Sequence, residues 1–266
     1  MRSGARIAAV VATTVGILVI TGGARSELDR ILPPRAEPEG SPERLVRAFS
    51  DDSWWSTPLP DDAPTDPAGR KILGYLRTGP DSGDGCLKLA GVGDSHWGQP
   101  MYFAHPSDTE YDVRAKHYEL PPELRALRIP DAARPAANND STMTIYDVDK
   151  GYVVALTGAD YDGRRDLWSA SGATVTYLAS NGLHDKTGLS DDPRNQGTHR
   201  GNNGATMAVS WDQVQAGELD HVLKIASGPE VSHRYIFPMV GSDGHGPSDD
   251  PAVPPEGIRL LSLIHI

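Results

Sequence analysis

The sequence is short of cysteine, of basic residues and of long apolar runs. Its 266 residues include a single cysteine, Cys86, so no disulfide can form within the chain. Lys and Arg number 25 against 36 Asp and Glu, a formal charge of −11, whereas proteins that bind the nucleic-acid backbone normally display a basic surface. We therefore expect no nucleic-acid partner, and a fold that its hydrophobic core must stabilise without disulfides.

The longest apolar run is too short to span a bilayer as a straight helix. It covers residues 7–20 (IAAVVATTVGILVI), and a helix of that length reaches about 21 Å into a hydrocarbon core about 30 Å thick. Arg2 and Arg6 precede the run and small residues follow it, as in a secretory signal peptide. We expect residues 1–24 to be a cleaved signal peptide and the protein to be secreted or to reside in the cell envelope. The alternative is an uncleaved N-terminal membrane anchor, because residues 22–24 (GGA) depart from the A-x-A cleavage pattern.

Proline marks the segment that follows. Residues 25–85 combine many prolines with many acidic residues, which is typical of an extended tether. Ser41 can cap a helix and Pro42 suits its first position, so one short helix is expected there. A second short helix is expected around residues 71–76.

From Cys86 onward, short apolar runs are separated by turn residues. Residues 142–148 alternate cleanly, and Asp149-Lys150-Gly151 is typical of a tight hairpin turn. One helical turn is expected near residues 210–216. Strands are expected at 86–90, 100–104, 124–129, 142–148, 152–157, 173–179, 205–209, 219–226, 234–240 and 257–261. This pattern predicts that residues 86–266 form an all-β domain, either a β-sandwich or a jelly roll.

The densest polar segment is residues 191–204 (DDPRNQGTHRGNNG), which lies between two predicted strands. It contains His199, Arg200, Asn202 and Asn203, which we predict to be catalytic. In a polysaccharide lyase, His or Tyr removes the proton α to a uronic carboxylate, and Arg or Asn stabilises the enolate that results. The alternative is a long polar loop in which Asn and Asp cap turns and Gly adopts positive φ.

Two acidic runs that contain glycine, residues 160–166 and 242–250, offer clustered oxygens for a cation such as Ca²⁺. Neither has the bidentate Glu that completes an EF-hand, so solvated turns are the alternative interpretation. The sequence therefore leaves the metal and cofactor content open.

Aromatic and histidine side chains outside the loop have two possible roles. The adjacent pair Trp54-Trp55 in a polar segment can form a flat platform for a sugar ring. His221 lies among apolar residues of a predicted strand, and such a histidine is usually a hydrogen-bonded core residue.

Several segments between residues 99 and 260 resemble a known family in their order and spacing. They are QPMYFA at 99–104, LRIPDAARP at 127–135, NDSTMTIYD at 139–147, VQAGELDHVL at 214–223 and PPEGIRL at 254–260. On these segments the chain resembles a family of uncharacterised secreted proteins of actinobacteria and related soil bacteria. The resemblance implies export, a β-rich domain and a continuation past residue 260, and it assigns no activity. Related sequences often carry His where this chain has Thr142.

The last hexapeptide, residues 261–266 (LSLIHI), looks like translated sequencing-adapter sequence. On that interpretation the β-sandwich domain is truncated at its C-terminus. A short native β-strand at the terminus is the alternative.

These features predict an exported protein that binds or processes an extracellular polysaccharide, with residues 191–204 in its site. The alternative is a non-catalytic binding or structural module of the cell envelope. The acidic charge disfavours anionic polymers unless Ca²⁺, or Arg194 and Arg200, offset the repulsion. A groove that holds His199, Arg200 and an Asn beside an aromatic side chain would indicate the enzyme, and a flat face that bears only Trp would indicate the module.

Overall fold

The computed structural model shows a β-rich protein with few helices. It describes residues 48–60, 62–82, 99–137, 140–197, 200–201, 203–205, 211–217, 219, 221–223 and 229–260. The expected signal peptide, the expected helix near Ser41, Cys86 with the strand expected at 86–90, and residues 261–266 lie outside this part of the chain.

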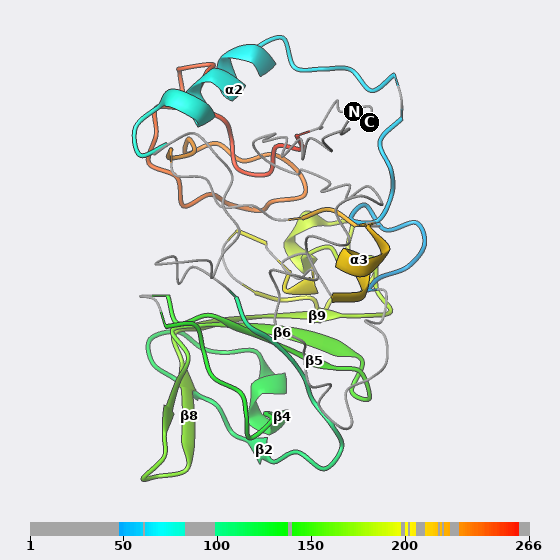
Figure 1. Ribbon diagram of the computed structural model, residues 1–266, viewed down its shortest axis with the longest axis vertical. Helices are drawn as coiled ribbons and strands as arrows, with labels where there is room; N and C mark the ends of the chain where they lie inside the picture. The colour runs from blue at the N-terminus through cyan, green and yellow to red at the C-terminus, as the bar shows by residue number, and fades with distance from the viewer. Residues whose placement is uncertain are drawn as a thin grey trace, which may run out of the picture.

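A four-stranded sheet forms the centre of the protein (Figure 1). Its strands, in spatial order, are β1 (Met101–Phe103), β5 (Met143–Asp147), β6 (Tyr152–Thr157) and β9 (Gly172–Tyr177). β1 runs parallel to β5, and the other neighbours are antiparallel. Gly151, at φ 73°, closes the turn between β5 and β6, and its N–H donates to Val148 O at 3.1 Å. The predicted strands at 100–104, 142–148, 152–157 and 173–179 and the predicted hairpin turn are thus confirmed.

Two smaller sheets lie on one side of the central sheet (Figure 1). One has the order β3 (Arg114–Ala115), β8 (Leu167–Ala170) and β7 (Asp160–Asp162), and the other pairs β2 (Glu110–Tyr111) with β4 (Leu127–Arg128). β7 and β8 form a hairpin around a turn at 163–166. The run 160–166, for which the sequence predicts a cation loop or a solvated turn, supplies one strand and the turn of this hairpin.

Some predicted strands are absent, chiefly where proline intervenes. Within the expected strand at 124–129, a 3-10 helix η1 (Pro122–Ala126) with proline at its start occupies the first part, and only β4 is extended. Residues 234–240 contribute only an isolated bridge from Tyr235 to Glu256, and a turn at Phe237–Pro238 interrupts this segment. Proline cannot donate to a strand ladder, which disfavours a continuous strand there. Residues 257–260 are not in a strand. Residues 221–223, in the expected strand at 219–226, are not in a strand either.

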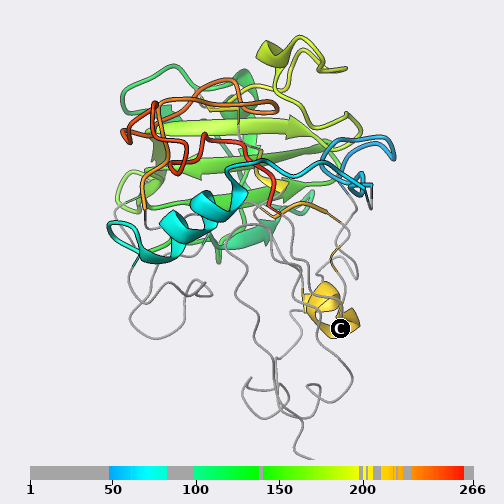
Figure 2. The same cartoon turned by 90° about the horizontal axis from the view of Figure 1, so that it is seen from above.

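The helices are short. α2 (Gly69–Thr78) confirms the helix expected around 71–76 and buries Ile72 and Leu76. Its Tyr75 hydroxyl donates to Glu230 O at 3.0 Å, which joins it to the C-terminal segment that lies near it in Figure 2. α3 (Trp211–Ala216) confirms the helical turn expected near 210–216, and η2 (Asp185–Thr187) is a 3-10 helix. Among the described residues, none of the helices combines the length and apolarity needed to cross a membrane.

The central sheet is buried on both faces. Met143 and Ile145 of β5 and Val154 and Leu156 of β6 belong to a cluster that also contains Trp168 and Ala170 of β8. On the opposite face, a second cluster joins Tyr146 and Val153 to Phe49, Trp55, Leu178 and Leu183. Alternate side chains of β5 therefore enter two different hydrophobic cores, instead of one core and the solvent.

Candidate functional site

The polar segment that follows β9 folds back onto the central sheet. Gln196 and Val175 exchange two backbone hydrogen bonds, of 2.8 and 3.0 Å, which extends the sheet at the edge of β9. Gly197 and Gly204 approach the sheet so closely that a β-carbon would lie 2.7 Å from Thr174 Cγ2 and 3.1 Å from Ala155 Cβ, respectively. The described parts of the 191–204 loop are therefore packed on the sheet.

Asn195 organises this segment from the inside. Its side chain is 1% exposed. The amide oxygen accepts from Tyr177 N at 2.8 Å, and the amide nitrogen donates to Ser180 Oγ at 2.9 Å and to Leu183 O at 3.0 Å. One buried amide thus ties residue 195 to the end of β9 and to residues 180–183.

The neighbouring polar side chains hold turns. Asn181 accepts from Leu183 N through Oδ1 at 3.1 Å and donates to Leu189 O through Nδ2 at 2.8 Å. Asp191 accepts from Asn181 N at 2.8 Å, and Ser190 Oγ donates to Asp192 O at 2.8 Å. These contacts are those of a polar loop whose Asn, Asp and Ser side chains stabilise its own backbone.

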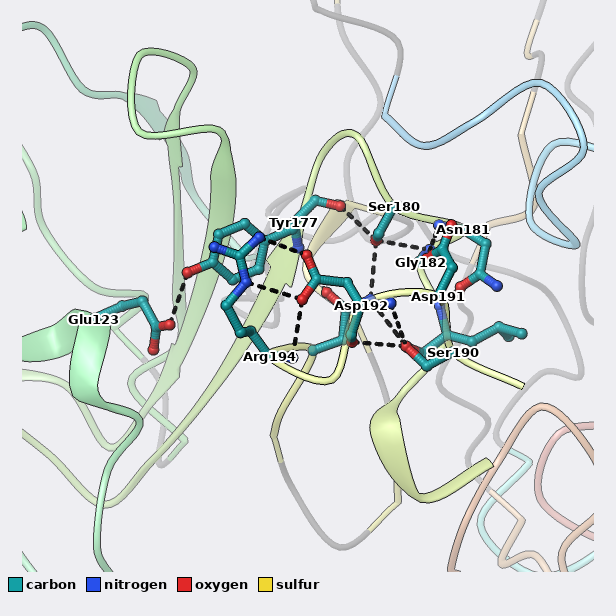
Figure 3. Close-up of polar contacts among 11 residues, drawn as sticks. Glu123, Tyr177, Ser180, Asn181, Gly182, Ser190, Asp191, Asp192 and Arg194 are labelled. Carbon is teal, nitrogen blue, oxygen red and sulfur yellow. Dashed lines mark hydrogen bonds and ion pairs between the residues drawn. The ribbon is translucent and has the colours of Figure 1, made fainter. Parts of the chain in front are cut away.

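A row of charged and aromatic groups lies on the surface of the same segment (Figure 3). The Tyr177 hydroxyl donates to Glu123 Oε1 at 2.8 Å, and the guanidinium carbon of Arg194 lies 3.7 Å from the centre of the Tyr177 ring. Arg194 Nε and Nη2 donate to the two carboxylate oxygens of Asp192 at 2.9 and 2.7 Å. Arg194 therefore combines a bidentate ion pair with a cation–π contact.

These contacts fix the protonation of the row. Hydrogen bonding to Arg194 lowers the pKa of Asp192, and the same bond raises the pKa of the Arg194 guanidinium. Burial, together with the bond to Glu123, raises the pKa of Tyr177 to about 12. At neutral pH the row therefore presents a neutral phenol between a carboxylate and a guanidinium, which can bind hydroxyl or carboxylate groups but gives Tyr177 no tendency to act as a base.

A small hollow lies between this loop and β9. Its lining includes Thr176, His184, Asn195, Gly201 and Asn203. His184 is 6% exposed, and its Nδ1 lies 2.6 Å from Asp185 Oδ1. Its Nε2 is buried and bonds to no other described residue. The hollow is too narrow in this structure to hold a ligand.

Burial lowers the pKa of His184, against the opposing effect of Asp185. Nδ1 also accepts from Lys186 N at 3.1 Å, so the imidazole caps the start of η2. His184 is not among the residues predicted from the sequence. One sequence signal points to it. His184 is followed directly by Asp185 and lies two residues after Gly182, in a polar loop just after the predicted strand at 173–179.

The two predicted catalytic residues that the structure describes, Arg200 and Asn203, have different surroundings. Arg200 Nη1 lies 2.8 Å from Asp243 Oδ2 and 3.7 Å from Glu256 Oε1, so its guanidinium links the loop to the C-terminal segment. Asn203 is 2% exposed and lines the hollow beside His184. His199 and Asn202 lie outside the described residues.

The tryptophan pair does not form an open platform. Trp55 is 5% exposed, and its Nε1 donates to Gly182 O at 2.8 Å. Trp54 packs edge-on against Phe237 at 5.9 Å, and the Arg259 guanidinium lies 5.0 Å from its ring centre. Both rings are therefore engaged within the protein.

His221 and the acidic runs have local partners. His221 Nδ1 lies 3.0 Å from Val222 O, and the residue is half-buried. In the run 160–166, Asp162 pairs with Arg165 at 3.5 Å. In the part of the chain that the structure describes, no three His, Cys, Asp or Glu side chains converge in a way that could hold a metal ion.

Comparisons of this chain with protein families, with curated proteins and with solved structures find no match. Its function must therefore be argued from the site itself.

Proposed function

We propose that this protein is exported and that it binds or processes an extracellular polysaccharide, with residues 191–204 in its site. The observation that carries the proposal is the surface row of Glu123, Tyr177, Arg194 and Asp192. It offers a carboxylate, a phenol and a guanidinium side by side, which are groups that hydrogen-bond sugar hydroxyls and carboxylates. Arg194 is 61% exposed, so a ligand can reach its guanidinium.

The proposed fold is a two-sheet β-sandwich, formed by the central sheet and the β3-β8-β7 sheet. Its support is the shared core: Trp168 and Ala170 of β8 pack in one cluster with Met143 and Ile145 of β5. Such a scaffold holds loops such as 191–204 at the margin of a sheet, where binding residues are commonly found.

The proposed route of export is the signal peptide at residues 1–24, and an N-terminal membrane anchor is the other possibility. The proposed partner is a polysaccharide and not a nucleic acid, because acidic residues outnumber basic ones by 36 to 25. Edman sequencing of protein recovered from culture medium tests the export route: a start near Arg25 supports cleavage, and an intact Met1 contradicts it.

A polysaccharide panel tests the function directly. Catalysis would release reducing ends, or unsaturated product in the case of a lyase. His199→Ala should then reduce turnover by roughly 10²-fold or more, as expected for loss of a general base. Arg194→Ala should weaken binding of acidic polysaccharides selectively, and Arg125→Ala, which also removes an exposed arginine, is a charge-matched control.

The second candidate function is a non-catalytic module of the cell envelope. A specific observation favours it: Arg200 is committed to Asp243 and Glu256, so a role in stabilising an enolate would require those ion pairs to open. Binding of a glycan with no product on the panel would establish the module. If the protein neither binds nor cleaves any glycan, the polysaccharide proposal is wrong.

A further inference from the structure

The β7–β8 hairpin holds an exposed tyrosine against the core. Tyr161 on β7 is 39% exposed, although its register partner on β8, Trp168, is only 3% exposed. The two rings lie with their centres 5.0 Å apart and their planes 31° apart. The buried tryptophan therefore supports the tyrosine ring, while part of that ring remains open to solvent.

Two further contacts fix the edge of the Tyr161 ring. Its hydroxyl donates to Asp166 Oδ1 at 2.7 Å, and the Tyr111 hydroxyl donates to the same oxygen at 3.3 Å. Tyr111 also packs edge-on against Tyr161, with ring centres 6.2 Å apart. Asp166 adopts φ 51°, a left-handed conformation that the turn imposes on it. Three strands and a turn thus converge to hold one exposed ring.

This arrangement differs from ordinary exposure of an aromatic residue. Tyr118 is 74% exposed, and its one ring contact among the described residues is with His117 at 6.5 Å. Tyr161 has already lost its side-chain freedom on folding, so little further conformational entropy of this side chain is lost when a ligand packs on it. A ring that is both fixed and exposed is suited to binding a flat apolar surface.

We propose that Tyr161 and Asp166 form a binding site for one sugar ring of a neutral polysaccharide. The C–H face of the sugar packs on the open part of the Tyr161 ring, and a sugar hydroxyl donates to the Asp166 carboxylate. The proposal rests on the proposed function in taking a polysaccharide as the ligand, but it places the contact on the β7–β8 hairpin rather than in residues 191–204.

The local charge selects a neutral ligand. The hairpin carries three carboxylates, Asp160, Asp162 and Asp166, against the two guanidinium groups of Arg164 and Arg165. Arg165 is already paired with Asp162, and the whole chain has a formal charge of −11. An anionic polymer would be repelled by this surface, whereas a neutral one would not.

Affinity electrophoresis of the full chain tests the site, with xyloglucan, galactomannan and mixed-linkage β-glucan as neutral probes and polygalacturonate as the acidic probe. Tyr161→Ala should weaken binding to a neutral probe by about 10-fold or more, the effect of losing an aromatic contact worth about 1.4 kcal/mol. Tyr161→Phe keeps the ring and should retain most of the affinity. Asp166→Asn keeps an acceptor for the tyrosines but replaces one carboxylate oxygen by an amide donor, so its affinity should lie between these two.

Tyr118→Ala is the matched control, because it removes a more exposed tyrosine and should leave binding unchanged. Circular dichroism of each variant shows that the fold is retained, and Tyr161→Phe and Asp166→Asn still test the site if Tyr161→Ala unfolds. Equal losses in Tyr161→Ala and Tyr118→Ala, or no loss in either, would overturn the site while leaving the proposed function intact. Binding to polygalacturonate alone would also overturn the site. So would self-association of the protein that Tyr161→Ala abolishes, because the exposed ring would then bind a second copy of the chain. If the protein binds none of the probes, both the proposed polysaccharide function and the Tyr161–Asp166 site are wrong for these glycans.

Discussion

Gly197 lies against Thr174 with no space for a side chain: a β-carbon built on Gly197 would be 2.7 Å from Thr174 Cγ2 and 2.9 Å from its Cβ. Thr174 lies on β9 and is itself 3% exposed, so it cannot move outward to make room. The polar loop that carries the candidate site therefore rests on the sheet at a point where only glycine fits.

Replacement of Gly197 by Ala should lower the free energy of unfolding by about 2 kcal/mol, the usual cost of overpacking a close contact. Gly172→Ala, on the same strand as Thr174, is the matched control, because a β-carbon there meets no atom within 4 Å. Urea denaturation of the two variants measures the difference. Equal stability of the two would show that the loop is not held against Thr174.

Replacement of Asn195 by Ala should destabilise the protein by about 3 kcal/mol, because buried partners of its amide would lose their hydrogen bonds. Those partners are Tyr177 N, Ser180 Oγ and Leu183 O. Ser190→Ala is the control and should cost less, since it removes a long 3.4 Å hydrogen bond from the Asn195 amide and one local bond to Asp192 O. A denaturation midpoint for Asn195→Ala close to that of the wild type would contradict the central role of this amide.

The protein should become less stable as the pH is lowered below about 6.5, the ordinary pKa of histidine. Burial lowers the pKa of His184 in the folded state, so the unfolded chain takes up a proton at a higher pH than the folded chain does. The contribution is therefore complete above pH 6.5 and is lost as the pH falls toward the folded pKa. Asp185 and Lys186 are the charged groups whose effects on His184 oppose each other.

Urea midpoints at pH 8 and pH 5 measure this dependence. His184→Gln should reduce the difference between the two pH values, because glutamine cannot be protonated in this range. His105→Gln is the control, since His105 is exposed. An unchanged pH dependence in His184→Gln would show that other groups cause it.

Replacement of Arg200 by Ala should loosen the attachment of residues 230–260 to the loop, because it removes the ion pairs with Asp243 and Glu256. We expect faster cleavage of that segment in limited proteolysis, with a loss of stability of about 1 kcal/mol, since the Arg200 side chain is 29% exposed. Asp243→Ala should reproduce the effect, and the double variant should add little to it. Additive losses in the double variant would show that the two residues do not act as a pair.

The β-rich character and the central hairpin could be predicted from the sequence. The alternating run before Asp149-Lys150-Gly151 and the apolar run after it are local signals, and the turn fixes their register. The prediction was wrong where local signals compete. The apolar residues at 124–129 indicate a strand, but the proline at the start of η1 favours a 3-10 turn. It also missed the β7–β8 hairpin, because its acidic residues outweighed the short apolar run at Leu167–Ala170.

The candidate site was predicted only in outline. Residues 191–204 were identified by their density of polar side chains, yet composition could not show that Arg200 pairs with Asp243 or that Asn195 is the buried centre of the segment. His184, which lines the hollow, lies outside that segment and was not singled out. His199 and Asn202 keep their predicted roles as hypotheses for mutagenesis.

The sequence by itself determined the charge, the absence of an internal disulfide, the short strands and the polar loop, because each depends on composition or on neighbours along the chain. The tertiary structure alone decided which side chains meet: Tyr177 with Glu123, 54 residues away, and Tyr161 with both Trp168 and Tyr111. Strand periodicity specifies which face a residue takes but not which distant strand will lie beside it. That choice is made when the two cores close on either face of the central sheet, and the polar contacts follow from it.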